Sequence, residues 1–61
     1  MPIITFEGPP VKDLNKKREA ASKVASAASE LYNLDIKTIV IIFKENTAEN
    51  VAPGGKLLID R

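Results

Sequence analysis

The residue with the clearest chemical potential in this sequence is the proline at its second position. The sequence begins Met1-Pro2 and continues with a β-branched and aromatic run over residues 3–6. Removal of Met1 would make Pro2 an amino-terminal secondary amine, which is both a base and a nucleophile. An ordinary α-amino group has a pKa of about 7.7–8.0, and desolvation or a nearby cation lowers it further. Since the chain has no His and no Cys, this amine is the best-placed base near neutral pH, as proton transfer requires.

The same proline also has a purely structural interpretation. A strand accepts proline as its first residue, because the missing N–H costs no ladder hydrogen bond at that position. The first six residues leave both interpretations open, so the remaining 55 residues of the 61-residue chain must decide between them.

The elements that position Pro2 begin with a strand and a helix. Residues 2–7 predict the strand, because they are rich in Ile, Thr and Phe. Gly8-Pro9-Pro10 ends this strand, and Asp13 is a typical helix N-cap. Apolar residues then recur at spacings of three, four and seven over residues 14–32, which predicts one face of an α-helix. Asn33 is a typical left-handed stop.

A second strand is predicted over residues 36–43, and its apolar run lacks alternation, which is typical of a strand covered on both faces. Strand, helix and strand in this order predict a right-handed βαβ unit. Pro53-Gly54-Gly55 predicts a bend, and residues 56–59 predict a short final strand that adds to a neighbouring chain's sheet. The fold class is therefore α/β, with a single domain over residues 1–61.

Chain length makes association the expected source of stability. Burial of apolar surface supplies about 85 kcal/mol at ~25 cal/mol/Å², and ordering the chain costs about 90 kcal/mol. The absence of Cys and His excludes disulfides and argues against a zinc site. We therefore expect no metal and a homo-oligomer that completes the two-stranded sheet.

Charge and hydropathy argue against two classes of partner. The net charge of +1 provides no general field for nucleic acid or an anionic membrane. No apolar run approaches the ~20 residues of a transmembrane helix, and the first residues do not resemble a signal peptide. We therefore expect a cytoplasmic protein that binds neither nucleic acid nor membrane.

Several short motifs and their spacing together resemble one family. Met1-Pro2-Ile3 opens the chain, Glu7-Gly8 closes the first strand, and Gly54-Gly55 precedes a short terminal segment. With the βαβ pattern, these features resemble the 4-oxalocrotonate tautomerase family over essentially the whole chain. The Gly8-Pro9-Pro10 turn and the tail of residues 45–58 are similar to one microbial subgroup.

The resemblance implies a chemistry and an assembly. It implies that Pro2, freed from Met1, acts as the general base in enol–keto tautomerisation of an unsaturated 2-oxo acid, without a metal or organic cofactor. It also implies a hexamer built as a trimer of dimers, in which Pro2 of one subunit meets pocket walls from its neighbours. The small-molecule partner would be the 2-oxo acid or its enol.

The sequence departs from the family at three positions. Well-studied members have Arg after Glu-Gly, a second Arg in the second strand and Phe before Gly-Gly, where this chain has Pro9, Val40 and Val51. Val51 therefore stands at a position where the resemblance implies a contact with substrate, but its side chain differs from the Phe of those members. The loss of both arginines leaves open a second hypothesis, a non-catalytic oligomeric scaffold or binding module. Hydrolytic dehalogenation or decarboxylation is a weaker third, since those reactions also depend on arginines.

Other side chains could replace the missing cations. Candidates for substrate binding are Lys16, near the predicted helix start, and Lys44, at the end of the second strand, with Thr38 as a hydroxyl donor. Lys12, Lys17 and Arg18 lie in the same region. Each has a plainer interpretation, because a basic cluster usually forms a solvated helix face and Thr is a common strand former.

Overall fold

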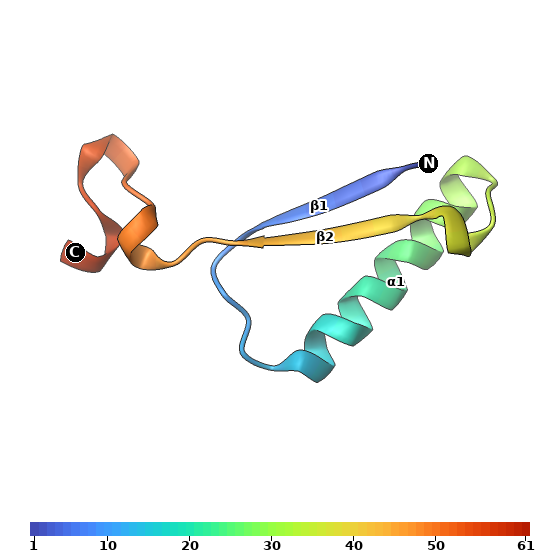
Figure 1. The fold of residues 1–61 in the computed structure, drawn as a ribbon, viewed down its shortest axis with the longest axis horizontal. Helices are drawn as coiled ribbons and strands as arrows, with labels where there is room; N and C mark the ends of the chain where they lie inside the picture. The colour runs from blue at the N-terminus through green and yellow to red at the C-terminus, as the bar shows by residue number, and fades with distance from the viewer.

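Two parallel strands and one helix make up the main body of the chain (Figure 1). The computed structural model describes all residues 1–61. Strand β1 (Ile3–Gly8) is followed by helix α1 (Leu14–Tyr32) and strand β2 (Val40–Glu45). The strands pair in register from Ile3 opposite Val40 to Gly8 opposite Glu45. The predicted βαβ unit is therefore confirmed.

The two faces of this sheet have different surroundings. Side chains alternate between faces along a strand, so Phe6 and Phe43, which are register partners, share one face. Their rings stack 5.0 Å apart with an interplanar angle of 7°. Helix α1 covers this face, since the Lys17 Nζ lies 5.7 Å from the Phe43 ring centroid. The opposite face carries Ile3 and Ile42, which are 54% and 39% exposed.

Helix α1 has the bounds that the sequence predicts, because both of its ends are set locally. The Asp13 side chain accepts the N–H groups of Asn15 and Lys16, and Asn33 adopts the left-handed conformation at φ 54° and ψ 47°. Small side chains let the helix lie close to the sheet. The alanine and valine residues of α1 that are half-buried or buried are Ala20, Ala21, Val24, Ala25 and Ala28.

The second strand begins later than the sequence predicts. The sequence predicts an extended backbone over residues 36–43, but Ile36–Thr38 form a single 3-10 turn and β2 begins at Val40. The Asp35 side chain accepts the Lys37 N–H at 2.9 Å, and the Thr38 hydroxyl donates to the Asp35 carbonyl at 2.7 Å. Such local hydrogen bonds compete with the extended conformation.

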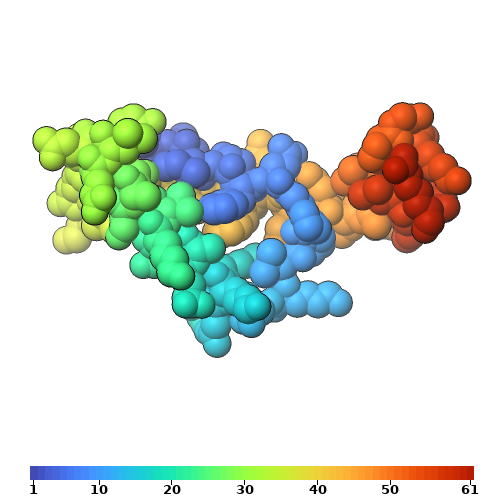
Figure 2. Space-filling view, turned by 180° about the vertical axis from the view of Figure 1, so that it is seen from behind, coloured from blue at the N-terminus to red at the C-terminus, as the bar shows by residue number.

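The predicted final strand over residues 56–59 is wrong for the single chain. Leu58–Asp60 form a 3-10 turn, and the tail closes on itself because the Leu58 N–H donates to the Val51 carbonyl at 2.8 Å. Gly54 and Gly55 make the predicted bend with φ of 66° and 86°. No sheet edge lies beside this segment, and the tail forms a lobe apart from the βαβ unit (Figure 1, Figure 2).

The chain leaves more surface uncovered than a compact domain of its size. Its radius of gyration is 14.8 Å, against about 10.5 Å for a compact chain of this length. Its accessible surface is 4869 Å², against about 3,900 Å² expected for this mass. Ala28, at 7% exposure, is the one buried residue. The open sheet face and the free edge of β1 therefore remain without cover from the chain itself.

The close approach of α1 to the sheet predicts a sharp difference between two neighbouring alanines. Ala28→Leu should lower the free energy of unfolding by about 1–3 kcal/mol, because the added methyl groups must push the helix away from the sheet. Ala27→Leu is the matched control, since Ala27 is exposed and Ala and Leu have similar helix propensities. Urea unfolding at equal protein concentration measures both, and equal midpoints for the two variants would contradict the packing described.

Candidate functional site

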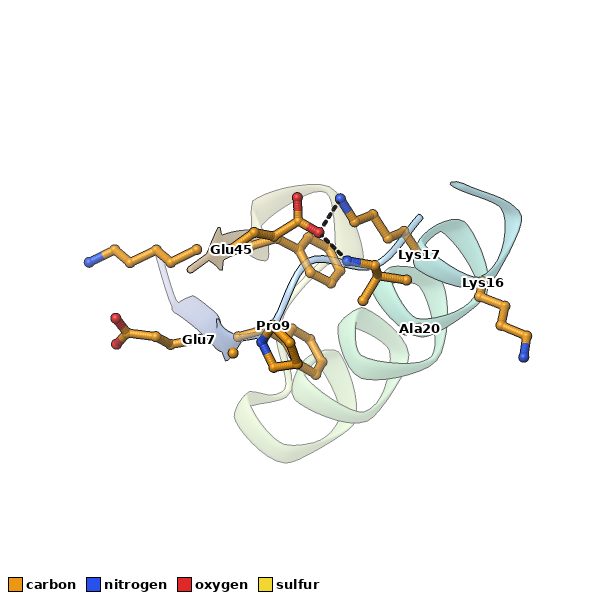
Figure 3. A pocket seen from close by; sticks show the side chains of 11 residues that line it. Glu7, Pro9, Lys16, Lys17, Ala20 and Glu45 are labelled. Atoms are coloured by element: carbon orange, nitrogen blue, oxygen red, sulfur yellow. Dashed lines mark hydrogen bonds and ion pairs between the residues drawn. The ribbon is translucent and has the colours of Figure 1, made fainter. Parts of the chain in front are cut away.

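The larger hollow of the molecule lies where the two strands end and α1 begins (Figure 3). We call it the main cleft, and its volume is about 390 Å³. It takes side chains from both strands, from the loop after β1 and from the first turns of α1. Its lining residues are Phe6, Glu7, Gly8, Pro9, Val11, Lys16, Lys17, Ala20, Phe43, Lys44 and Glu45.

Aromatic and small side chains make much of the main cleft apolar. The stacked rings of Phe6 and Phe43 contribute two faces from the strands. Ala20 of α1 and Val11 of the loop add further apolar lining. Because Ala20 has a short side chain, the helix leaves space above the rings that a larger residue would fill.

One ion pair controls the charge inside the main cleft. The Glu45 carboxylate accepts a hydrogen bond from Lys17 Nζ at 2.7 Å and one from the Val11 N–H at 2.7 Å. The Lys17 contact, and after it the Val11 N–H, holds the pKa of the Glu45 carboxyl below its ordinary value of 4.5. This is the one salt bridge of the chain. Lys16 and Glu7 point away from the cleft (Figure 3).

A smaller hollow, which we call the side hollow, flanks the main cleft. Its volume is about 280 Å³, and Glu7, Gly8 and Pro9 line both spaces. Val51 and Leu58 of the tail form its far wall with Asn46. Gly8-Pro9 therefore divides the two hollows at the end of β1.

The structure separates the sequence-predicted site residues into two groups. Lys16 and Lys44 line the main cleft and Val51 lines the side hollow. Pro2 and Thr38 lie at the opposite end of the sheet, where the Pro2 carbonyl accepts the Val40 N–H at 3.0 Å. The strand between them has six residues, which corresponds to about 20 Å. A single chain therefore does not bring Pro2 to the main cleft.

The residues of the main cleft that sequence reasoning missed include Phe6, Phe43 and Glu45. The signal was present in the ends of the two strands, which read Phe6-Glu7-Gly8 and Phe43-Lys44-Glu45. Parallel pairing in this register places the two rings side by side and leaves Glu45 opposite a glycine. The two motifs alone do not show which residues pair, so the arrangement becomes evident only once the strand register is known.

Two other kinds of site have no support in the residues described. No group of three or more His, Cys, Asp or Glu side chains comes together as a metal site. No helix of the chain has the length and apolar character needed to cross a bilayer.

Comparisons with known proteins agree with the fold. A family model described as tautomerase enzyme matches residues 2–61. DmpI from Archaeoglobus fulgidus is 42% identical, with a TM-score of 0.80 over 97% of this chain and 100% of that one. YwhB, a homologue of 4-oxalocrotonate tautomerase, is 27% identical, with a TM-score of 0.86 over 98% of each chain.

A further solved structure shows the same fold. The 4-oxalocrotonate tautomerase homologue TTHB242 is 24% identical, with a TM-score of 0.90 over 100% of this chain and 97% of that one. A search of curated proteins gave no match. The chain has the tautomerase fold and belongs to the tautomerase family of isomerase-type enzymes.

The contacts of Glu45 predict how stability depends on pH. Because its folded-state pKa lies below the ordinary value of 4.5, its contribution is complete above that value and is lost as the pH falls through the folded-state pKa. In Glu45→Gln, the urea midpoint should therefore fall less between about pH 5 and about pH 3 than in the parent. Glu49→Gln, on the exposed turn Ala48–Asn50, should keep the parent's dependence. Parallel curves for Glu45→Gln and the parent would contradict the prediction.

Proposed function

We propose that this protein is a cofactor-independent tautomerase that interconverts the enol and keto forms of an unsaturated 2-oxo acid. The general base is the amine of Pro2, after Met1 has been removed. The observation that carries the proposal is the tautomerase family match, which begins at Pro2 and extends to the last residue of the chain. The 4-oxalocrotonate tautomerase homologues among the similar structures support it.

The position of Pro2 suits a base that must be held still. Its side chain is half-buried, and its carbonyl is fixed by the Val40 N–H at 3.0 Å. Met1 is 83% exposed, so the bond to Pro2 is open to an aminopeptidase. With Met1 attached, the Pro2 nitrogen is a tertiary amide and has no basic lone pair. The free amine would take the enol O–H proton and return a proton to a carbon of the conjugated system.

A second copy of the chain supplies the route by which Pro2 reaches a cleft. The free edge of β1 can pair with β1 of another copy in antiparallel fashion about a two-fold axis. With the strands fully overlapped, Ile3 of one copy faces Gly8 of the other. The next residue out, Pro2, then faces Pro9, which lines both the main cleft and the side hollow. Each active site would thus combine the base of one copy with the walls of its partner.

The uncovered sheet face supports a larger assembly than a dimer. Pairing through β1 gives a four-stranded sheet with both helices on one side. The other side still presents apolar residues such as Ile3 and Ile42. Three dimers arranged with these faces inward form a hexamer, a trimer of dimers, which covers this surface by closed symmetry.

The substrate carboxylate would contact the lysines without an ion-pair partner near the site, and Lys16 would first have to turn in from the outward direction seen in Figure 3. Lys17 is paired with Glu45, whereas Lys16 and Lys44 form no salt bridge and line the main cleft. Val51, in the side hollow, would contact the apolar part of the substrate. Thr38 lies at the Pro2 end of the sheet, but its hydroxyl already donates to the Asp35 carbonyl, which makes it the weakest of these candidates.

One feature favours the alternative of a non-catalytic scaffold with the same fold. The positions at which the family resemblance leads us to expect Arg, Arg and Phe hold Pro9, Val40 and Val51. A correctly processed, assembled protein that tautomerises none of a panel of neutral, monoanionic and dianionic enols would favour the scaffold.

Replacement of Pro2 tests the chemistry directly. Protein that retains Met1, whose Pro2 nitrogen is an amide, should ketonise an arylpyruvate enol or a 2-hydroxydienoate about 10²–10⁴-fold more slowly than processed protein, the usual contribution of a general base. Absorbance of the enol measures the rate, and mass spectrometry confirms that Met1 is absent. Processed Pro2→Ala should also be slower than the parent, because it keeps only a primary α-amine that no ring holds in one orientation. Lys23→Ala, on an exposed part of α1, should match the parent. Full activity in protein that keeps Met1 would exclude the mechanism.

The proposed hexamer predicts the effect of a charge on the open sheet face. Ile42→Lys should convert hexamers into dimers, because the hexamer would bury six charged lysine side chains at its centre, at a large cost in desolvation free energy. Ser26→Lys, on an exposed part of α1, should remain hexameric. Sedimentation equilibrium at micromolar concentration measures both. A folded monomer in the parent protein would contradict the assembly, and the shared active site with it.

A further inference from the structure

The loop that joins β1 to α1 is tied to the rest of the chain by one hydrogen bond. This connecting loop consists of residues 9–12, and its first two residues are prolines, which have no N–H to donate. The Val11 N–H donates to Glu45 Oε2 at 2.7 Å, across 34 residues of sequence. The connecting loop makes no other hydrogen bond through its backbone. The position of its backbone therefore depends on the Glu45 carboxylate.

The strand register lets Glu45 reach this loop. Glu45 is the last residue of β2 and lies opposite Gly8. A Cβ at Gly8 would have nothing within 4 Å, so the chain's own packing does not require a glycine there. A longer side chain at this position would stand beside that of Glu45 on the same face of the sheet. From the end of β2, the Glu45 side chain reaches the Val11 N–H of the loop.

The same carboxylate oxygen also orients the start of α1. Lys17 Nζ lies 2.7 Å from Glu45 Oε2, and Lys17 is half-buried over the Phe43 ring. Figure 3 shows both contacts converging on Glu45 at the main cleft. One side chain thus joins the end of β2, the connecting loop and α1.

We infer that Glu45 is a positioning residue, whose carboxylate fixes the connecting loop and thereby Pro9, where Pro2 of a second copy meets the main cleft. This inference rests on the proposed function, because it assigns the loop to an active site shared between copies. Glu45 acts through the Val11 N–H and does not touch the reacting atoms. A displacement of about 1 Å in a positioning element can reduce a rate by about 10²-fold, so a loosened loop should affect the reaction more than binding.

Two conservative variants separate the hydrogen bond from the charge. Glu45→Gln keeps the length of the side chain and an acceptor oxygen for the Val11 N–H but removes the negative charge. Glu45→Asp keeps the charge but is one methylene shorter, so it no longer reaches the connecting loop. Positioning predicts that Glu45→Gln retains most of the activity and that Glu45→Asp behaves like Glu45→Ala. An electrostatic role in the cleft predicts the reverse order.

Steady-state kinetics on the processed, assembled protein provide the first measurement. Glu45→Ala and Glu45→Asp should lower kcat by about tenfold or more while KM changes by less than about threefold, because an orienting contact has been lost and no ground-state contact with substrate has been removed. Glu49→Ala, on the exposed turn Ala48–Asn50, is the control for loss of a carboxylate. Sedimentation equilibrium shows whether each variant assembles like the parent.

Amide hydrogen exchange provides a second measurement that does not depend on activity. The Val11 N–H should exchange about tenfold faster or more in Glu45→Ala and Glu45→Asp than in the parent, and at the parent's rate in Glu45→Gln. An inactive parent with this exchange pattern would refute the proposed function while leaving the loop contact established. Unchanged Val11 exchange in Glu45→Ala, or a kcat that follows the charge and not the reach of residue 45, would overturn the inference.

Discussion

The structure of this chain depends on the parallel pairing of β1 with β2. The chain has too few residues to cover both faces of this two-stranded sheet. Helix α1 covers one face through small side chains, and Ala28, at 7% exposure, is the one buried residue there. The other face keeps Ile3 and Ile42 in contact with solvent. Parallel strands are normally covered on both faces, and two strands rarely persist alone in water. In the proposed assembly, other copies of the chain would supply the missing layer.

The same shortage explains why a catalytic site in so short a chain would be shared between copies. Pro2 lies at one end of the sheet and the main cleft at the other, separated by the length of β1. No loop of the chain crosses from one end to the other. A two-fold axis beside β1 reverses the direction of the second strand and so exchanges the two ends. Under the proposed function, the separation seen in one chain is thus what an antiparallel dimer needs.

Parts of this fold that depend on neighbouring residues could be predicted from the sequence, and parts that depend on distant residues could not. Asp13 and Asn33 set the bounds of α1 through contacts within a few residues. The start of β2 was misplaced because the Asp35 and Thr38 contacts outweigh the β propensity of the residues around them. The sequence pattern of the tail predicts a strand, but a strand needs a partner edge, which one chain does not offer. The Phe6–Phe43 stack and the Glu45 contacts follow from strand register, which no local pattern specifies.

The charges of the main cleft bear on how a substrate would be oriented without the arginines of the family. An Arg guanidinium holds a carboxylate through a planar pair of hydrogen bonds, which fixes its direction, whereas a Lys ammonium is a point charge on a flexible stem. Lys16 and Lys44 could therefore attract a carboxylate without aligning it. Alignment would then have to come from shape, through the stacked rings of Phe6 and Phe43 and the wall of the connecting loop. Such a wall is effective only if it is rigid. Two consecutive prolines restrict the loop's backbone, and the Glu45 carboxylate holds the first N–H that follows them.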